Sequence, residues 1–309
     1  MALIARLRES DFLYHFRRDP VALGSALVLL LLLAAGLAAP LFAPHNPYDP
    51  ASIDVMDSKL PPLGFSSDEA AADPRFLLGT DDQGRDMLST ILYGLRVSLL
   101  IGMGAVALQA LLGIGIGLVA GYAGRKTDAF LMRLADVQLS FSTYMVAIFL
   151  GAVFQALLGV GRYEEIAVPF LIAVIGLAEW PKYARTVRAS VLSEKKKEYV
   201  EAARVVGLPA WRIMWRHILP NTLTPVLVIS TVQVANAIMS EAALSFIGLG
   251  MPVTKPSLGS LIKNGFKYIL SGSWWITLFP GLVLVALILT INLLGDWLRD
   301  YLNPKLYKK

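Results

Sequence analysis

The sequence offers few side chains that could carry out covalent or metal chemistry. It has no cysteine among 309 residues and only three histidines, His15, His45 and His217, which lie far apart. Disulfide scaffolds and thiolate-bound metals are therefore excluded, and the histidine spacing fits no metal-ligand pattern. The phosphate-binding pattern G-x-x-x-x-G-K-[ST] is also absent from the sequence. We expect this chain to be no enzyme and to bind no metal or cofactor itself.

Four charged residues stand in or beside long apolar stretches, where an unpaired charge is costly. Glu179 and Glu241 are either neutral or paired packing residues, or residues that face a pore or gate, and the sequence leaves both interpretations open. Arg133 and Asp136 lie three residues apart, so they share one helix face and could form an ion pair at the inner interface. An intramembrane relay is the alternative.

A glycine-rich stretch also invites a nucleotide-binding interpretation, but its context argues against one. Gly113, Gly117 and Gly121 lie four residues apart in or at the end of an apolar run, with no strand pattern before them. Small residues at this spacing share one helix face and allow a second helix to approach closely. We expect them to serve helix packing.

The composition indicates a polytopic membrane protein. Hydrophobic residues make up 56% of the chain and charged residues only 17%, and the mean hydropathy is +0.59. About a quarter of the residues are charged in an ordinary soluble domain. The net charge of +5 reflects lysine and arginine retained in cytoplasmic loops rather than nucleic-acid binding, so the expected non-protein partner is membrane lipid.

Six apolar runs predict an all-α fold with six transmembrane helices. The runs cover residues 21–43, 96–121, 129–158, 166–188, 222–247 and 275–297. About 20 residues at 1.5 Å per residue span the hydrocarbon core. We expect the first run to be an uncleaved helix, because it is long for a signal peptide.

Charge then orients the chain and divides it into segments. The N-terminus, the residues after the second and fourth runs and the C-terminus are basic, which places both termini in the cytoplasm, although the loop 248–274 opposes this trend. We expect an amphipathic segment at 1–20, a first span at 21–43, a large acidic and proline-rich extracytoplasmic loop at 44–95, a five-helix core at 96–298 and a cytoplasmic tail at 299–309.

Residues 194–220 form a basic, polar segment within that core. Its first part favours a helix, and Gly207 can adopt the left-handed conformation that ends one. Pro209 then suits the start of a second helix. Ala202 and Ala203 are small enough for close backbone approach. These properties predict two short helices at the cytoplasmic face, although composition alone also fits a solvated loop.

The pattern of this segment resembles the EAA loop of ABC importer permeases. It consists of E-A-A, three residues, glycine, ten residues and I-x-P, and its positions are filled by Glu201, Ala202, Ala203, Gly207, Ile218 and Pro220. Arg204 and Leu208 lie within the same motif. A second Glu-Ala-Ala, at 241–243, lies inside an apolar run and shows that the tripeptide alone is not specific.

Further segments resemble the C-type permease of dipeptide, oligopeptide and nickel ABC importers, over about residues 10–307. They read LGTDDQGRD at 78–86, EAALSFIGLG at 241–250, KPSLG at 255–259, FPG at 279–281 and NLLGDWLRD at 292–300. Two sites depart from the family pattern. Ser140-Phe141-Ser142 stands where relatives commonly carry proline, which suggests a milder kink, and Leu258 stands where they often carry tryptophan.

This resemblance implies a type I ABC permease fold with a cytoplasmic coupling helix, in the bacterial inner membrane. It implies a B-type permease partner, two ATPase subunits or domains that bind ATP and Mg, and an extracytoplasmic solute-binding protein. Half of the pore would belong to this chain. Four residues of the external loop could receive the binding protein or tie the loop down: Asp81, Asp82, Arg85 and Asp86.

Peptide transport is the expected function, with alternatives. A permease of the same family could carry nickel or another small solute. An ion-driven secondary transporter is a further alternative, but such folds usually contain internal repeats, and none is visible between the two halves of this sequence. A membrane scaffold without transport activity would purify without an ATPase partner.

Overall fold

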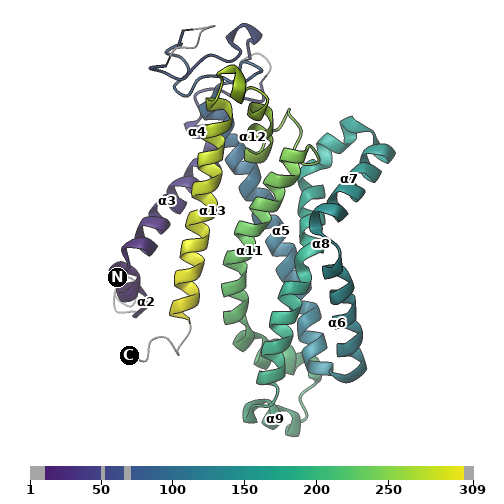
Figure 1. Ribbon diagram of the computed structural model, residues 1–309. Coiled ribbons are helices and arrows are strands. Elements are labelled where there is room, and N and C mark those ends of the chain that lie inside the picture. Colours follow the sequence, from purple (N-terminus) through teal and green to yellow (C-terminus); the bar gives the residue numbers. More distant parts are fainter. Residues whose placement is uncertain (1–10, 50–52, 66–70, 303–309) are drawn as a thin grey trace. The chain divides into compact units, whose positions relative to one another are not determined.

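The computed structural model describes residues 11–49, 53–65 and 71–302, and most of these residues lie in helices (Figure 1). In this part of the chain, five helices are long and apolar enough to cross a membrane, or six if one bent pair forms a single span. The expected helical membrane architecture is therefore confirmed. Residues 1–10 of the predicted amphipathic segment and 303–309 of the predicted tail lie outside the described residues.

The chain divides into two compact units. The first comprises Met1–Ile101, Glu164–Val168 and Ile238–Lys309, and the second comprises Gly102–Tyr163 and Pro169–Ala237. Three long helices contribute residues to both: α5 (Met87–Ala123), α8 (Val160–Glu194) and α11 (Leu219–Ile247).

The first unit begins with α2 (Asp11–Arg18), which is joined directly to α3 (Pro20–Leu37). The Asp19 carboxylate caps α3 by accepting hydrogen bonds from the backbone N–H groups of Val21 and Ala22, at 3.0 and 3.1 Å. Proline suits the first helical position because its missing N–H would have no partner there. The described part of the predicted amphipathic segment is thus helical, and Phe12 of α2 packs edge-on against Trp297, with ring centroids 5.1 Å apart.

Short helices and the two C-terminal spans complete this unit. They are α4 (Ala39–Phe42), η2 (Val55–Asp57), α12 (Leu258–Phe266), η4 (Ile269–Ser271) and α13 (Trp275–Tyr301). Both α3 and α12 pack against α13 (Figure 1). A Cβ atom on Gly259 of α12 would lie 2.5 Å from the Cα of Ala242, so only glycine permits this close contact with α11.

The second unit contains α6 (Arg125–Ser140), α7 (Thr143–Leu158) and α9 (Glu198–Val205), together with α10 (Ala210–Ile213) and the π-helix η3 (Met214–Ile218). The glycine face of α5 packs against α8 as predicted. A Cβ on Gly117 would lie 2.5 Å from the backbone oxygen of Ala184, and a Cβ on Gly121 would lie 2.7 Å from the Cβ of Val191.

The third apolar run differs most from its prediction. It is a pair of helices, α6 and α7, bent by 79° at Ser140-Phe141-Ser142, a sharp break within what the hydropathy pattern predicted as one span. Phe141 is extended (φ −97°, ψ 135°), which interrupts the helix without proline. The ion pair of Asp136 also differs from the prediction, because its partner is Arg185 of α8 rather than Arg133.

Helix boundaries differ from the hydropathy pattern at three places. The helix α5 begins at Met87, nine residues before the apolar run, so part of the predicted loop 44–95 is helical. The helix α13 continues to Tyr301, and α12 lies in the predicted loop 248–274. Polar helix ends and short amphipathic helices do not stand out by hydropathy.

Candidate functional site

The segment 194–220 contains two helical arms joined by a tight turn, as its sequence predicts. The first arm, α9, ends in a Schellman motif: Gly207 N–H donates to Arg204 O at 2.9 Å, and Leu208 N–H donates to Ala203 O at 3.1 Å. Gly207 has a φ of +82°, the left-handed conformation expected for it. A Cβ on Gly207 would meet no atom within 4 Å, so the requirement for glycine is purely conformational.

The surface of α9 has an inward and an outward side. Val200 and Ala203 are buried, whereas Glu201, Ala202 and Arg204 are exposed. Of the two alanines expected to allow close approach, only Ala202 is therefore available to another protein. Two valines that follow on the outside are almost fully exposed, with exposed fractions of 88% for Val205 and 77% for Val206.

The second arm runs through α10 and η3 into α11. Pro209 is the N-cap residue of α10. Ile213 and Ile218 are fully buried, while Trp211 and Trp215 are more than half exposed. The π-helix η3 was not predicted, since no residue in Met214–Ile218 signals the wider turn. Such π-turns often occur at functional sites.

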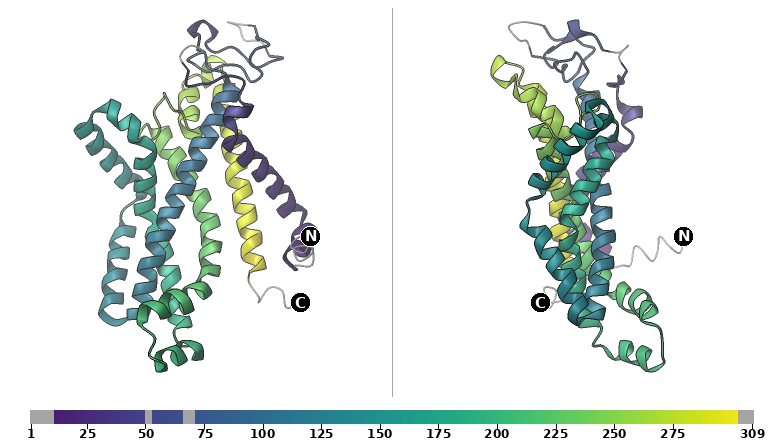
Figure 2. Two further views of the ribbon diagram at one scale, coloured as in Figure 1. Left: turned by 180° about the vertical axis from the view of Figure 1, so that it is seen from behind. Right: turned by 90° about the vertical axis from the view of Figure 1, so that its right-hand side faces the viewer.

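Side-chain contacts connect the segment to the ends of the neighbouring helices, from which α9 projects in Figure 2. The Lys195 ammonium donates a hydrogen bond to the backbone oxygen of Gly121 at 2.7 Å. The Arg204 guanidinium lies 5.4 Å from the ring centroid of Tyr122. Both contacts reach the C-terminal end of α5, so this polar segment has a defined position within its unit.

Two further polar residues, Tyr199 and Asn221, are part of this arrangement, although the sequence gave no reason to single them out. The Tyr199 hydroxyl donates to the Glu194 carboxylate at 2.5 Å and accepts from the Asn221 amide at 3.0 Å. Only their place beside the motif could have suggested them.

Glu179 is an ion-paired residue at the level of the α6–α7 bend. Its carboxylate pairs with Lys182 one turn further along α8 and accepts a hydrogen bond from the Thr143 hydroxyl at 2.7 Å. Thr143 is the first residue of α7. This contact fits the paired-residue interpretation and links the bend to α8.

Glu241 is fully buried inside the first unit. Its carboxyl group accepts hydrogen bonds from Ser98 at 2.8 Å and from Ser245 at 2.7 Å. Ser245 Oγ in turn accepts from the Met251 N–H at 3.0 Å. This network of hydroxyl groups joins α5, α11 and the connection to α12, which fits the packing interpretation of Glu241.

Three of the four predicted loop residues are almost fully buried, with exposed fractions of 1% for Asp81, 2% for Arg85 and 4% for Asp86. The Arg85 guanidinium pairs with the Asp81 carboxylate at 2.6 Å and donates to the Val253 carbonyl at 2.9 Å. The Asp86 carboxylate accepts from the Ser89 N–H at 2.9 Å in the first turn of α5. These contacts support the interpretation that the residues tie the loop down.

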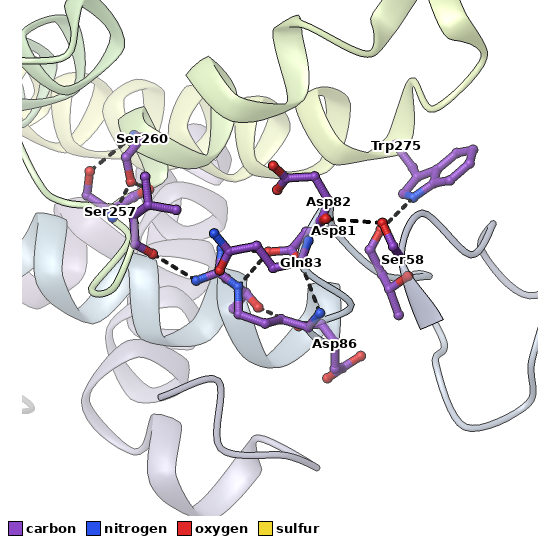
Figure 3. Close-up of polar contacts among 12 residues, drawn as sticks. Ser58, Asp81, Asp82, Gln83, Asp86, Ser257, Ser260 and Trp275 are labelled. Carbon is purple, nitrogen blue, oxygen red and sulfur yellow. Dashed lines mark hydrogen bonds and ion pairs between the residues drawn. The ribbon is translucent and has the colours of Figure 1, made fainter. Parts of the chain in front are cut away.

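Two backbone oxygens of this loop also accept hydrogen bonds from side chains (Figure 3). The Trp275 indole N–H donates to Thr80 O at 3.1 Å, and Ser58 Oγ donates to Asp82 O at 3.1 Å. Asp82 itself is half-buried. Burial raises the pKa of its carboxyl group, and the nearby negative charge of Asp81 raises it further. In the described parts of the chain, no group of three or more His, Cys, Asp or Glu side chains could hold a metal ion.

Comparison with known proteins yields two matching family models. The model described as "Binding-protein-dependent transport system inner membrane component" matches residues 113–308. The model described as "N-terminal TM domain of oligopeptide transport permease C" matches residues 10–62. The two matches cover the segment 194–220 and the first span.

Curated relatives match over nearly the whole chain. The di/tripeptide transport system permease protein DppC of Pseudomonas aeruginosa is 37% identical over 96% of this chain and 92% of its own length. The dipeptide transport system permease protein DppC of Escherichia coli K12 is 36% identical over 96% of this chain and 93% of its own length.

A solved structure shares the fold. An inward-facing structure of the MetNI methionine ABC transporter matches with a TM-score of 0.55 and 18% identity, over 70% of this chain and 98% of the matched chain. The chain belongs to the family of binding-protein-dependent transport system inner membrane components, and it is a multi-pass permease subunit of an ABC importer with a type I permease fold, not an enzyme.

Proposed function

We propose that this chain is the C-type permease of an importer for dipeptides or short oligopeptides in a bacterial inner membrane. Its partners would be a B-type permease, two ATPase subunits or domains that bind ATP and Mg, and an extracytoplasmic binding protein. The similarity to two DppC permeases over 96% of this chain supports the peptide substrate. Residues 194–220 and both termini would lie in the cytoplasm.

The observation that carries the mechanism is the outward side of the segment 194–220. It presents exposed Val205, Val206 and Trp211 beside the charged Glu201 and Arg204. Exposed apolar side chains within a charged rim are typical of a surface that receives a partner protein. We infer that this side enters a cleft of the ATPase.

ATP hydrolysis would then act on the permease through a rigid connection. The Schellman turn at Gly207 fixes the angle between the two arms, and Lys195 and Arg204 hold the segment against the end of α5. When the ATPases close, the segment would move and favour one of two pore states. A switch of this kind requires contacts that differ in free energy between the states.

On the external side, we propose a smaller role in docking than the sequence suggested. Asp81, Arg85 and Asp86 are occupied by contacts inside the loop. Asp82 is less buried than these three residues and is the remaining candidate of the four for contact with the binding protein.

The docking proposal is tested by cross-linking, which suits a chain with no native cysteine. We expect Ala202→Cys, on the exposed side of α9, to cross-link to single cysteines in the ATPase cleft of the assembled complex. The control is Met56→Cys, which is also at an exposed position but lies in the external loop. If Ala202→Cys cross-links to no position across the cleft, the docking surface is wrong.

The proposed substrate needs a separate test. Vesicles with the reconstituted complex and its binding protein should take up radiolabelled alanylalanine when ATP is supplied, and unlabelled peptide should compete. Uptake of nickel without uptake of the peptide would favour the alternative substrate. Uptake that continues without ATP but needs an ion gradient would contradict an ATP-driven importer.

A further inference from the structure

Tyr199 stands at the centre of a short hydrogen-bonded chain that joins three helices of the second unit. It lies in α9, its hydroxyl partner Glu194 is the last residue of α8, and its amide partner Asn221 is the third residue of α11. The O–H to carboxylate distance is 2.5 Å, and the amide to hydroxyl distance is 3.0 Å. Figure 1 shows α9 below the ends of α8 and α11.

The donors and acceptors among Glu194, Tyr199 and Asn221 are consistent with one another. A tyrosine hydroxyl has one proton to donate and can accept in return. The carboxylate of Glu194 takes the proton at 2.5 Å, since the other acceptor within reach, His217 O, is 3.4 Å away. The Asn221 amide has two protons and donates them to Tyr199 Oη and to His217 O, the latter at 2.9 Å. Each proton is used once.

The protonation state of Tyr199 agrees with this assignment. Burial raises the pKa of the Tyr199 phenol, and the hydrogen bond and negative charge of Glu194 raise it further. The phenol therefore keeps its proton at neutral pH and remains a donor. A bond from a neutral hydroxyl to a carboxylate is charge-assisted, which makes it stronger than a neutral pair.

The hydrogen-bonded chain also bridges helices that the backbone connects only through turns and short helices. Only residues 195–197 separate α8 from α9. On the other side, the path from α9 to α11 passes through the Gly207 turn, α10 and the π-helix η3. The bonds of Tyr199 close this path directly, because they connect positions 199 and 221 across the intervening turns.

We propose that Tyr199 is a positioning residue that makes α9 move together with α8 and α11. This inference rests on the proposed function, in which the ATPase moves α9. Without the hydroxyl group, α9 could tilt in the ATPase cleft while α8 and α11 stay behind. The ATPase would still dock and hydrolyse ATP, but the signal between the ATPase and the external side of the permease would be weakened.

The test measures that signal in the assembled complex with its partner permease, its ATPases and its binding protein as purified from cells. The readout is the ratio of ATP hydrolysis with the binding protein to hydrolysis without it. Tyr199→Phe keeps the ring and removes only the hydroxyl. We expect this ratio to fall by roughly threefold to tenfold, the range for loss of one to two hydrogen bonds. The matched control is Ser190→Ala, whose hydroxyl donates a hydrogen bond to Thr186 O within α8.

A second variant separates this role from a general loss of stability. Asn221→Ala removes the amide that donates a hydrogen bond to the Tyr199 hydroxyl, so it should lower the same ratio. The double variant should be no worse than the more affected single variant, because residues of one network are not additive. Additive defects would overturn the proposal, as would a Tyr199→Phe complex with an unchanged ratio.

Docking is scored separately through Ala202→Cys. If Ala202→Cys fails to cross-link in the otherwise unaltered complex, the proposed docking is wrong and this inference falls with it. The inference is supported if the cross-link forms in the otherwise unaltered complex and in the Tyr199→Phe complex, and if Tyr199→Phe lowers the ratio while Ser190→Ala does not. If the cross-link forms in both and the ratio is unchanged, Tyr199 has no such role, while the proposed function stands. A cross-link lost only in Tyr199→Phe would assign Tyr199 to docking and overturn the inference.

Discussion

Replacing Gly207 by valine perturbs the segment 194–220 at one backbone angle. The φ of +82° places Gly207 in the left-handed region, which side chains other than glycine rarely adopt. No atom lies within 4 Å of the Cβ position. A larger side chain therefore meets no steric clash, and the whole effect comes from the backbone conformation and from the two hydrogen bonds of the Schellman motif.

The size of the effect follows from the cost of that conformation. A left-handed residue with a Cβ costs about 1–2 kcal/mol relative to glycine, and β-branched residues are the least tolerant. A change of one or two kcal/mol alters an equilibrium by roughly 5–30-fold. Asparagine adopts this conformation more readily than other non-glycine residues. We therefore expect transport per inserted molecule to decrease from Gly207 to Asn, then Ala, then Val, with the valine variant almost inactive.

The assay compares ATP-driven uptake with the amount of chain in the membrane. Gly272 provides a matched control, since it is left-handed with a φ of +91° and has no atom within 4 Å of its Cβ position, but it lies between η4 and α13. Gly272→Val carries a comparable backbone strain and should keep most of its uptake per inserted molecule. The reasoning would be refuted by normal uptake in Gly207→Val, or by equal losses in the two valine variants.

Two further predictions concern packing and pH. Gly117→Ala should lower the thermal unfolding midpoint of the purified chain, because its Cβ would lie 2.5 Å from Ala184 O and overpacking costs about 1–3 kcal/mol. Gly115→Ala is the control, since there is open space around its Cβ position, and it should leave the midpoint unchanged. Equal midpoints in the two variants would contradict the packing argument. Asp82→Asn should raise the midpoint at neutral pH, because the folded-state pKa of Asp82 is raised and its ionised form therefore opposes folding. That advantage should vanish as the pH falls below the ordinary Asp pKa of about 3.9, and a midpoint difference that does not change with pH would contradict it.

The helical architecture could be predicted from sequence because hydropathy records burial in lipid directly. The glycines at 113, 117 and 121 could be predicted for a similar reason: their spacing matches the helix period, and their close contacts with α8 are present. Gly207 was predictable because few residues other than glycine adopt its conformation. In each of these cases, a local property of the sequence determines the structure.

The bend between α6 and α7 could not be predicted in this way. Proline is the usual signal for a kink, and Ser140-Phe141-Ser142 contains none, yet the helices are bent by 79°. The contact between Thr143 and Glu179 of α8 lies at this point. The partner that holds the first residue of α7 is 36 positions away in sequence, so no local pattern could reveal it.

Burial of the external loop residues could not be predicted from local sequence either. Asp81 and Arg85 are charged residues in a polar loop, and the sequence left open whether they face a partner or tie the loop down. The structure buries both, because each satisfies the charge of the other and Arg85 also reaches the Val253 carbonyl. Burial of a charge is favourable only when such partners are present, and Val253 lies too far along the chain for a sequence pattern to identify it.

The two Glu-Ala-Ala tripeptides show how context decides the role of identical residues. Glu201 is exposed on α9, whereas Glu241 is fully buried among serine hydroxyls in α11. The alanines differ in the same way, since Ala202 is exposed and Ala242 packs against Gly259. The buried Glu241 and Ala242 have their contacts satisfied within the chain, while the exposed Glu201 and Ala202 leave theirs to a partner. For this reason the first tripeptide, and not the second, is the surface on which the coupling proposal depends.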